Sequence, residues 1–298
     1  MGTKKYIIGG IDFIINKQNE PVFIEANSAP GAKLLAGTNM LEPIEALAKV
    51  VKKRVKNPQA AIVIRKKEKD EGNEWKQQQL NRFFPTHQCY FEYQDYSTPE
   101  LVDENGKNML PNVLLFNLLS FAQIYQSSAF MVNPKEAIRI TTDKHLSTMI
   151  VQNLTEVRTP KNFMVFSGTG TKRVADQVLE QFETGMVLKP VFGWGGKGVT
   201  VWKKVPRDFP KFREPMVLQN RVDLELKDGK FWDVRCYVVN GKFCGAVTRT
   251  SKQPVVNMNR GGHFEKLNSE FVNLVKKPTE QVAAAIDKIA CAISSKHQ

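Results

Sequence analysis

Hydrophobic and polar positions alternate along the first thirty residues in a way that predicts a β-hairpin. Two apolar runs rich in β-branched residues, 6–15 and 21–25, flank the polar stretch "NKQNE". Runs of this kind, separated by a short polar segment, are typical of paired strands. A second hairpin is predicted over 230–250, where the chain turns at Asn240-Gly241, a dipeptide that favours tight hairpin turns.

Helical periodicity and short apolar runs organise the rest of the chain. Apolar residues at helical spacing predict amphipathic helices over 38–55 and 278–294. Between residues 60 and 135, apolar runs alternate with polar helical segments, which favours a parallel sheet with covering helices. The chain is therefore expected to be an α/β protein. We expect strands at 60–65, 88–93, 112–116 and 129–132, and helices at 74–83, 118–126 and 171–183.

The first hairpin also carries candidate metal ligands. Because side chains alternate along a strand, Asp12 points away from its apolar neighbours, while Glu25 and Asn27 share one face of the second strand. Two carboxylates and an amide oxygen are hard ligands suited to Mg²⁺, which keeps waters and substrate phosphates in its other positions. The alternative is that Asp12 caps a turn and Glu25 is a solvated charge at the end of a strand.

Composition narrows the class of protein. The 298 residues include 42% hydrophobic residues and no apolar run of membrane-spanning length, so we expect a soluble, cytoplasmic protein with more than one lobe. The four cysteines lack metal-ligand spacing and are expected to be reduced packing residues. Lys and Arg exceed Asp and Glu by thirteen, which favours anionic ligands.

A glycine-rich turn lies between two further β-rich runs in "MVLKPVFGWGGKGVTVW", residues 186–202. Lys189 closes the first run, and the tip at Gly195 and Gly196 allows backbone N–H groups to approach phosphate oxygens. The segment matches neither the Walker nor the dinucleotide-binding pattern. Taken alone, it is equally compatible with a simple hairpin.

Together with later segments, this turn resembles an ATP-grasp enzyme. The resemblance spans most of the chain and is greatest to the carboxylate–amine ligases that include ribosomal-protein glutamate ligases and D-alanine–D-alanine ligases. It rests on an ordered set: Lys144 after "NPKEAI", Lys189, the loop Gly195-Gly196-Lys197, the strand ending in Gln219-Asn220-Arg221, the Asp233-x-Arg235 strand with Arg249, the segment from Asn257 to Arg260, and Asp12 with Glu25-x-Asn27.

The resemblance implies an ATP-grasp fold that binds ATP between two lobes. A substrate carboxylate would be phosphorylated by ATP, and an amine would then attack the acyl phosphate.

Lys144 and Lys189 would pair with the α and β phosphates, and Gly195, Gly196 and Lys197 would cover the γ-phosphate. The hinge Gln219, Asn220, Arg221 and Val222 would meet adenine, and Asp233 would contact the nucleotide. Arg249, Asn257 and Arg260 would stabilise the transferred phosphate, and Asp12, Glu25 and Asn27 would hold two Mg²⁺ ions, with Mn²⁺ as an alternative. Arg235 is equally compatible with a structural ion pair and with a ligand.

The order of these motifs differs from that of the family. There, the Glu-x-Asn strand comes last, whereas here it comes first. The predicted helix at 278–294, near the C-terminus, resembles the helix that precedes this strand in the family. We therefore expect a circular permutation, with a piece of a longer tandem protein as the competing explanation. The expected units are 1–56, the permuted metal-binding end of the second lobe; 57–135, the parallel-sheet module; 136–214, the lobe with the glycine loop; and 215–298, the rest of the second lobe.

Two other classes of function remain compatible with these residues. The same fold supports kinases that phosphorylate small anionic metabolites, and the positive net charge suits such substrates. Alternatively, the charge serves non-catalytic binding of polyanions, although the basic residues are dispersed and no stacking platform of aromatics is present, which disfavours nucleic acid. The substrates, expected to be anionic, and the oligomeric state do not follow from the sequence.

Overall fold

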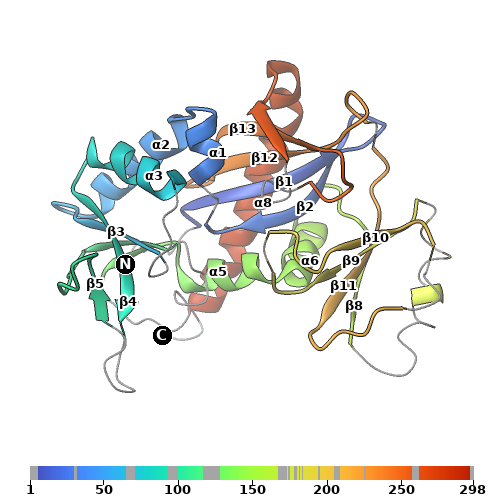
Figure 1. Cartoon of the computed structure of the whole chain (residues 1–298), viewed down its shortest axis with the longest axis horizontal. Coiled ribbons are helices and arrows are strands. Elements are labelled where there is room, and N and C mark those ends of the chain that lie inside the picture. The colour runs from blue at the N-terminus through green and yellow to red at the C-terminus, as the bar shows by residue number, and fades with distance from the viewer. Residues whose placement is uncertain are drawn as a thin grey trace.

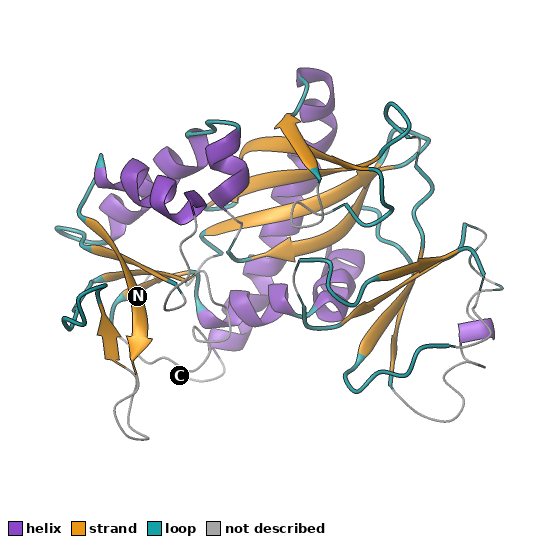
Figure 2. Cartoon of the chain, viewed as in Figure 1, coloured by secondary structure: helices purple, strands orange, loops and turns teal. Residues whose placement is uncertain are grey.

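The computed structural model describes residues 6–295 except 30–31, 65–70, 93–99, 117–127, 167–172, 174, 178–179, 181, 183, 194, 205–208, 225 and 257–261. Helices pack around three β-sheets, and each sheet forms a separate part of the molecule (Figures 1 and 2). Strands from both ends of the sequence lie side by side in the largest sheet.

The largest sheet has five antiparallel strands in the order β14-β13-β12-β1-β2. The predicted hairpin at its centre is confirmed, because Asn240 and Gly241 join β12 to β13 with φ angles of 50° and 79°. The first predicted hairpin, β1 with β2, is confirmed as well. The strands are β1 (Ile8–Ile15), β2 (Pro21–Asn27), β12 (Phe231–Val239), β13 (Lys242–Ser251) and β14 (His263–Lys266).

One face of this sheet is covered by helices α8 (Ser269–Ser295), α5 (Lys135–Thr142) and α6 (Lys144–Leu154). Alternate residues of the central strands, such as Ile11 and Val234, are fully buried against them. Burial of apolar area at about 25 cal/mol per Å² is the main stabilising contribution of such a layer. Strand alternation therefore places the residues in between, including Asp12, on the opposite face.

The opposite face has two parts. Near Ile8 and Val239 it is apolar and packs against helices α1 (Ala32–Gly37), α2 (Glu42–Arg54) and α3 (Glu71–Asn81). Further along the strands, the same face carries charged residues instead. The apolar part holds the sheet against its neighbours and leaves the charged part to form a site.

The second sheet has four antiparallel strands in the order β10-β9-β11-β8. Leu188 and Leu218 belong to a cluster on one face, so Lys189 and Gln219, one position along, lie on the other. The strands are β8 (Asn162–Val165), β9 (Met186–Pro190), β10 (Thr200–Trp202) and β11 (Met216–Asn220).

The third sheet confirms the predicted parallel module. Strands β3, β4, β6 and β7 are parallel neighbours, and β5 adds an antiparallel edge to β4. The sheet follows the order β5-β4-β3-β6-β7, with β3 (Ala60–Val63), β4 (Thr86–Glu92), β5 (Glu100–Val102), β6 (Val113–Phe116) and β7 (Phe130–Val132).

Several elements differ from the predictions. Helix α8 begins at Ser269 and contains Pro278, whereas apolar residues at helical spacing predicted a helix only over 278–294. The Thr279 hydroxyl donates a hydrogen bond of 2.6 Å to the Val275 carbonyl in the turn that contains Pro278. Helix α2 begins at Glu42 rather than 38, and β5 lies where the sequence predicted no strand. The helix predicted at 118–126 lies outside the described residues, as do many positions of 171–183.

In the part of the chain that the structure describes, we find no helix that combines the length and the hydrophobicity needed to cross a membrane.

Candidate active site

The three predicted metal ligands lie on one face of the antiparallel five-stranded sheet, β14-β13-β12-β1-β2. Asp12 on β1 lies directly opposite Glu25 on β2. Asn27 lies opposite Gly10, two residues from Asp12 on the same face of the sheet, so the Glu25 and Asn27 side chains are both neighbours of Asp12. Asp12 is 2% exposed, whereas the Glu25 side chain is 29% exposed. The hairpin register therefore brings two carboxylates and one amide together, with Glu25 accessible from outside.

Asp12 is also the centre of an ion-pair network on the same face. The Arg235 fork donates to both Asp12 oxygens, with Nε to Oδ1 at 2.7 Å and Nη2 to Oδ2 at 2.6 Å. Arg249 donates to Asp12 Oδ2 at 2.9 Å and holds Asp233 through two bonds of 2.6 and 2.7 Å. Glu25 lies at 3.8 Å from Arg235. These contacts show Arg235 in an ion pair and tie Arg249 to two aspartates.

Burial and these guanidinium groups set the charge state of the aspartates. Burial raises the pKa of Asp12, but Arg235 and Arg249 outweigh it and hold that pKa well below its usual range. Burial likewise raises the pKa of Asp233, to about 6, although Arg249 opposes the change. Both carboxylates are therefore ionised at neutral pH.

The donor set fits a divalent cation at Glu25 and Asn27. A carboxylate offers about four lone-pair positions, and the three N–H bonds to Asp12 leave one position on Oδ1. Asp12 can thus supply one oxygen while the arginines orient it. Among the described residues, no group of three or more His, Cys, Asp and Glu side chains forms a metal site, so an amide oxygen would be needed here.

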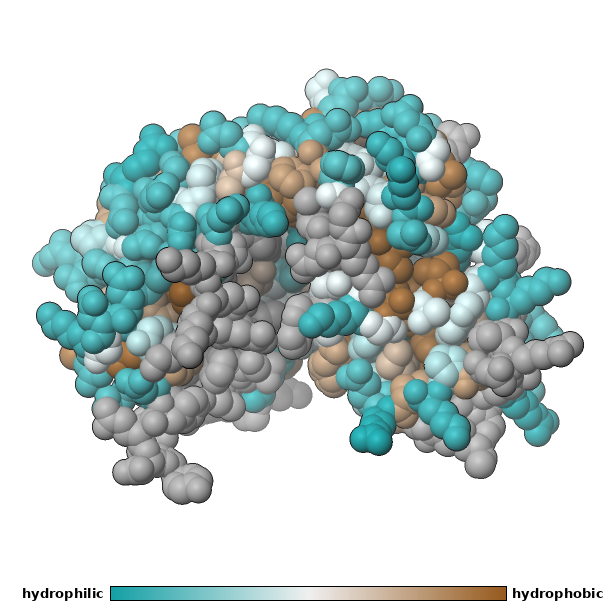
Figure 3. Space-filling model, in the orientation of Figure 1, coloured by the Kyte–Doolittle hydropathy of each residue, from teal (hydrophilic) through white to brown (hydrophobic). Residues whose placement is uncertain are grey.

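Lys189 brings the second sheet to this site. Its ammonium donates to the backbone carbonyl of Ile24, beside Glu25, at 3.3 Å. Burial lowers the pKa of Lys189 to about 8; Glu25 and Asp12 act in the opposite direction, and Lys144 adds to the lowering. The molecule is hollowed between the parallel module and the four-stranded sheet, on the face shown in Figure 3. Strands 165 residues apart therefore meet at one charged site.

The glycine turn is anchored next to Lys144. Lys144 begins helix α6, and its ammonium donates to the Gly193 carbonyl at 2.5 Å, while its backbone N–H donates to the Val191 carbonyl. Gly195 and Gly196 have φ angles of 69° and 67°, a region that glycine enters without steric cost. The turn therefore starts at a fixed point, and its tip has the backbone freedom expected of a phosphate-covering loop.

The predicted adenine hinge lies at the end of β11. Gln219 is buried on the same face of the sheet as Lys189, whereas Asn220 lies on the other face. The Arg221 N–H donates to Gly185, and its carbonyl accepts the Thr184 hydroxyl. The Asn220 N–H donates to the Lys161 carbonyl at 3.0 Å, so the backbones of both Asn220 and Arg221 are already hydrogen-bonded. Among the predicted hinge residues, Val222 is the remaining position for backbone contact with a base.

Asn257 and Arg260, expected to stabilise the transferred phosphate, lie outside the described residues. Lys197, expected beside the γ-phosphate, is exposed in the glycine turn. The hydrogen bonds and strand registers bring together the ion-pair network, the predicted metal ligands and Lys189, and Lys144 lies close enough to lower the pKa of Lys189. The position of the predicted hinge follows only from its strand.

Asn133 positions the β1–β2 hairpin, which carries the predicted metal ligands, and the sequence analysis missed it. Its buried side chain accepts from the backbone N–H groups of Ile7 and Ile8 at 2.6 and 2.9 Å. It also donates to the carbonyls of Ile8 and Ser28, both at 2.7 Å. The Asn-Pro dipeptide at 133–134 is a turn signal that marks the position, but it does not indicate these distant partners.

Comparison with known proteins identifies similar chains. The model of the RimK-like ATP-grasp domain matches residues 141–292, just over half of the chain. A structure from Methylobacillus flagellatus KT, assigned as a gamma-glutamylcysteine synthetase, has 13% identity and a TM-score of 0.65, and the match covers 98% of this chain and 90% of the other. D-alanyl-alanine synthetase A from Vibrio cholerae has 12% identity and a TM-score of 0.53, with 78% and 82% covered. At these identities the similarity shows the fold alone. A search of curated proteins returned no match.

Proposed function

Because the chain belongs to the RimK-like ATP-grasp family, we propose that it is an ATP-dependent ligase that joins a carboxylate to an amine. The observation that carries the proposal is the Lys189 bond to the Ile24 carbonyl. It places an ammonium group of the glycine-loop lobe beside the carboxylates of the metal-binding hairpin. Such an arrangement suits a nucleotide triphosphate with its magnesium ions.

In the proposed reaction, an oxygen of the substrate carboxylate attacks the γ-phosphorus of ATP, and ADP leaves. The amine then attacks the acyl carbon, and inorganic phosphate leaves with the electrons of the C–O bond and takes up the proton that the amine loses. Phosphoryl transfer of this kind depends mostly on positioning and charge neutralisation. Magnesium ions, when bound, would neutralise the phosphate oxygens.

The described residues would divide these tasks between the two lobes. Lys144 and Lys189 would bind phosphate oxygens, and the turn at Gly195 and Gly196 would close over them. Glu25 and Asn27 would hold metal, with Asp12 oriented by Arg235. The Arg249 guanidinium, fixed by Asp233, would present positive charge where the oxyanion develops.

Product analysis tests the proposed function. The protein should release ADP and phosphate from ATP only when a pool of amino acids and peptides supplies both acid and amine. Glu25→Gln should lower this turnover by about 100-fold or more, the scale of losing a group that stabilises transition-state charge. Glu74→Gln, an exposed position on α3, is the matched control and should retain turnover. ATP-dependent turnover that leaves phosphate on the product would instead identify a kinase, which the net charge of +13 also suits.

We also propose that the metal-binding hairpin is permuted relative to the family order. The family match ends at residue 292 and does not include β1 and β2. In the structure, the backbone N–H of Tyr6, just before β1, donates to Asp287 of α8. A chain started at Pro58, with Gln298 joined to Met1 by a flexible linker, should fold and keep turnover. Loss of folding in that variant would contradict the permutation.

A further inference from the structure

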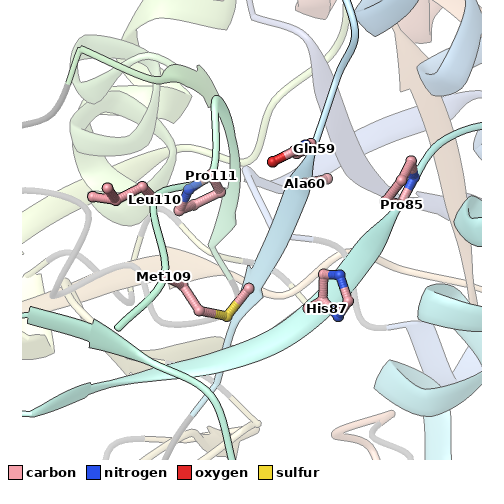
Figure 4. Close-up of a pocket in the computed structure, with 7 residues that line it drawn as sticks. All are labelled: Gln59, Ala60, Pro85, His87, Met109, Leu110 and Pro111. Carbon is pink, nitrogen blue, oxygen red and sulfur yellow. The ribbon is translucent and has the colours of Figure 1, made fainter. Parts of the chain in front are cut away.

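The parallel sheet carries a surface hollow at the amino ends of its strands. It has a volume of about 190 Å³ and is lined by β3, β4 and the segment before β6 (Figure 4). Met109 and His87 lie on opposite sides of β3, and Leu110 at the rim is 95% exposed. Ligand pockets for small molecules are larger, about 300 Å³ or more. The hollow is of a size for one apolar side chain.

One cation, Arg54, lies over the ring of Phe130 near this hollow. The Arg54 guanidinium lies over the Phe130 ring, at 5.6 Å from its centre, and donates to Asn240 at 3.3 Å. Phe130 in turn donates its backbone N–H to Asn112, the residue after the hollow's Pro111. Arg54 is therefore held over Phe130, whose backbone is bonded to the residue next to the wall of the hollow.

Two further cations, Lys52 and Arg82, lie over the ring of Phe83 near the hollow. Lys52 lies at 5.6 Å and Arg82 at 6.0 Å from the centre of the Phe83 ring. Phe83 is two residues before Pro85, which lines the hollow. Helix α2 ends with Lys52, Lys53 and Arg54 shortly before β3, and Arg82 directly follows α3 shortly before β4, so these basic residues lie at the same edge of the sheet.

These cations lack acidic partners in the part of the chain that the structure describes. The acids of α2 and α3 lie in the first turns, at the opposite ends of both helices. Asp103 follows β5 and accepts the N–H groups of Asn105 and Lys107 in its own turn. The basic residues next to the hollow thus have no ion-pair partner among the described residues.

We propose that this edge, defined by Lys52, Lys53, Arg54, Arg82 and the hollow, is a docking site for an acidic peptide segment of another protein. An apolar side chain of the segment would enter the hollow, and neighbouring carboxylates would pair with the cations. A single-stranded nucleic acid fits less well, because bases need open aromatic faces on which to stack. Here, cations already lie over both aromatic rings. The site is separate from the proposed active site and does not depend on the proposed ligase reaction.

Fluorescence anisotropy with a labelled eight-residue peptide of alternating Glu and Leu tests the site in the full-length protein. Arg54→Glu with Arg82→Glu should weaken binding about 10-fold or more, the effect of reversing charges that pair with a ligand. Lys276→Glu with Lys277→Glu, exposed on α8, makes the same change in net charge and should weaken binding less than about 2-fold. Leu110→Ser should weaken binding of this peptide but not of an all-Glu peptide.

Equal weakening by the α8 control pair would overturn the proposal, because it would show a response to net charge alone. Unchanged binding by the Arg54 and Arg82 variant would also overturn it. A labelled oligouridine that binds this edge more tightly than the peptide does would identify a nucleic-acid surface instead. ATP turnover and thermal unfolding of each variant should match the wild type, which separates loss of docking from loss of fold or of the ligase reaction.

Discussion

Buried charge occurs in two different settings in this protein. On the five-stranded sheet, Asp12, Arg235, Arg249 and Asp233 form a network in which each group has charged partners at 2.6–2.9 Å. Lys76 on α3 is also buried, at 7% exposure, but has no hydrogen-bond or ion-pair partner among the described residues. Lys189 stands between these cases, with one bond to a backbone carbonyl. The charges of the network hold the site in shape. The Lys189 charge is available to a ligand, and the Lys76 charge only destabilises the fold.

Breaking the network should have the largest effect on stability. Arg249→Met leaves Asp12 with fewer partners and Asp233 without its fork, so we expect the free energy of unfolding to fall by about 3–5 kcal/mol. Urea denaturation measures this change. Arg213→Met, at an exposed position, is the matched control. Adding Asp233→Asn should recover part of the loss, and a loss below about 1 kcal/mol would show that the network is not structural.

Removing the charge of Lys189 should affect ligand binding rather than folding. Lys189→Met should weaken binding of MgADP by about 10- to 100-fold, because a buried charge paired with phosphate is lost. Its unfolding free energy should stay the same or rise, since burial disfavours the ammonium. Calorimetric titration measures the affinity, with the exposed Lys203→Met as control. Unchanged affinity would remove Lys189 from the nucleotide site.

Removing the charge of Lys76 should stabilise the protein. Burial lowers the pKa of Lys76 from 10.5 to about 8. The charged form is therefore penalised in the folded state by up to about 3 kcal/mol below pH 8. We expect Lys76→Met to raise the free energy of unfolding by about 1–3 kcal/mol at pH 7.

The stabilising effect of Lys76→Met should depend on pH. Because the folded pKa lies below the unfolded value, the penalty is complete below about pH 8 and fades as the pH rises to about 10.5. The gain from Lys76→Met should shrink over the same range in urea denaturation. A variant that is less stable than wild type at pH 7 would show that the ammonium has a stabilising partner.

The smallest effect is expected for an exposed ion pair. Lys227 and Glu265 approach to 2.6 Å, but their side chains are 46% and 58% exposed. Glu265→Gln should change the free energy of unfolding by less than about 1 kcal/mol, because solvent screens such pairs. The change should become smaller still in 1 M salt. A loss as large as that of Arg249→Met would mean that burial does not distinguish these charges.

Local patterns predicted the parts of this fold that depend on local physics. Strand alternation placed Asp12, Glu25 and Asn27 on one face, and Asn240-Gly241 marked the central hairpin. The alternation of strands and helices predicted the parallel module. Each of these depends on residues close in sequence.

The partners of the site residues could not be predicted in the same way. Asp12 and Arg235 are 223 residues apart, and their bond depends on the register of β1 with β12. Asn133 reaches β1 across 125 residues. Tertiary packing also overrides local signals, because α8 begins at Ser269, before the predicted range of 278–294, and continues through Pro278. Long-range register and packing decide these contacts, and no local spacing encodes them.

A crystal structure with Mn²⁺ and a non-hydrolysable ATP analogue tests the central claim most directly. The account predicts an anomalous Mn²⁺ signal at Glu25 and Asn27, with Asp12 alongside, and phosphate oxygens within hydrogen-bond distance of Lys189. A nucleotide bound away from these residues, or a metal held elsewhere, would contradict the proposal that the hairpin and the glycine-loop lobe enclose one ATP.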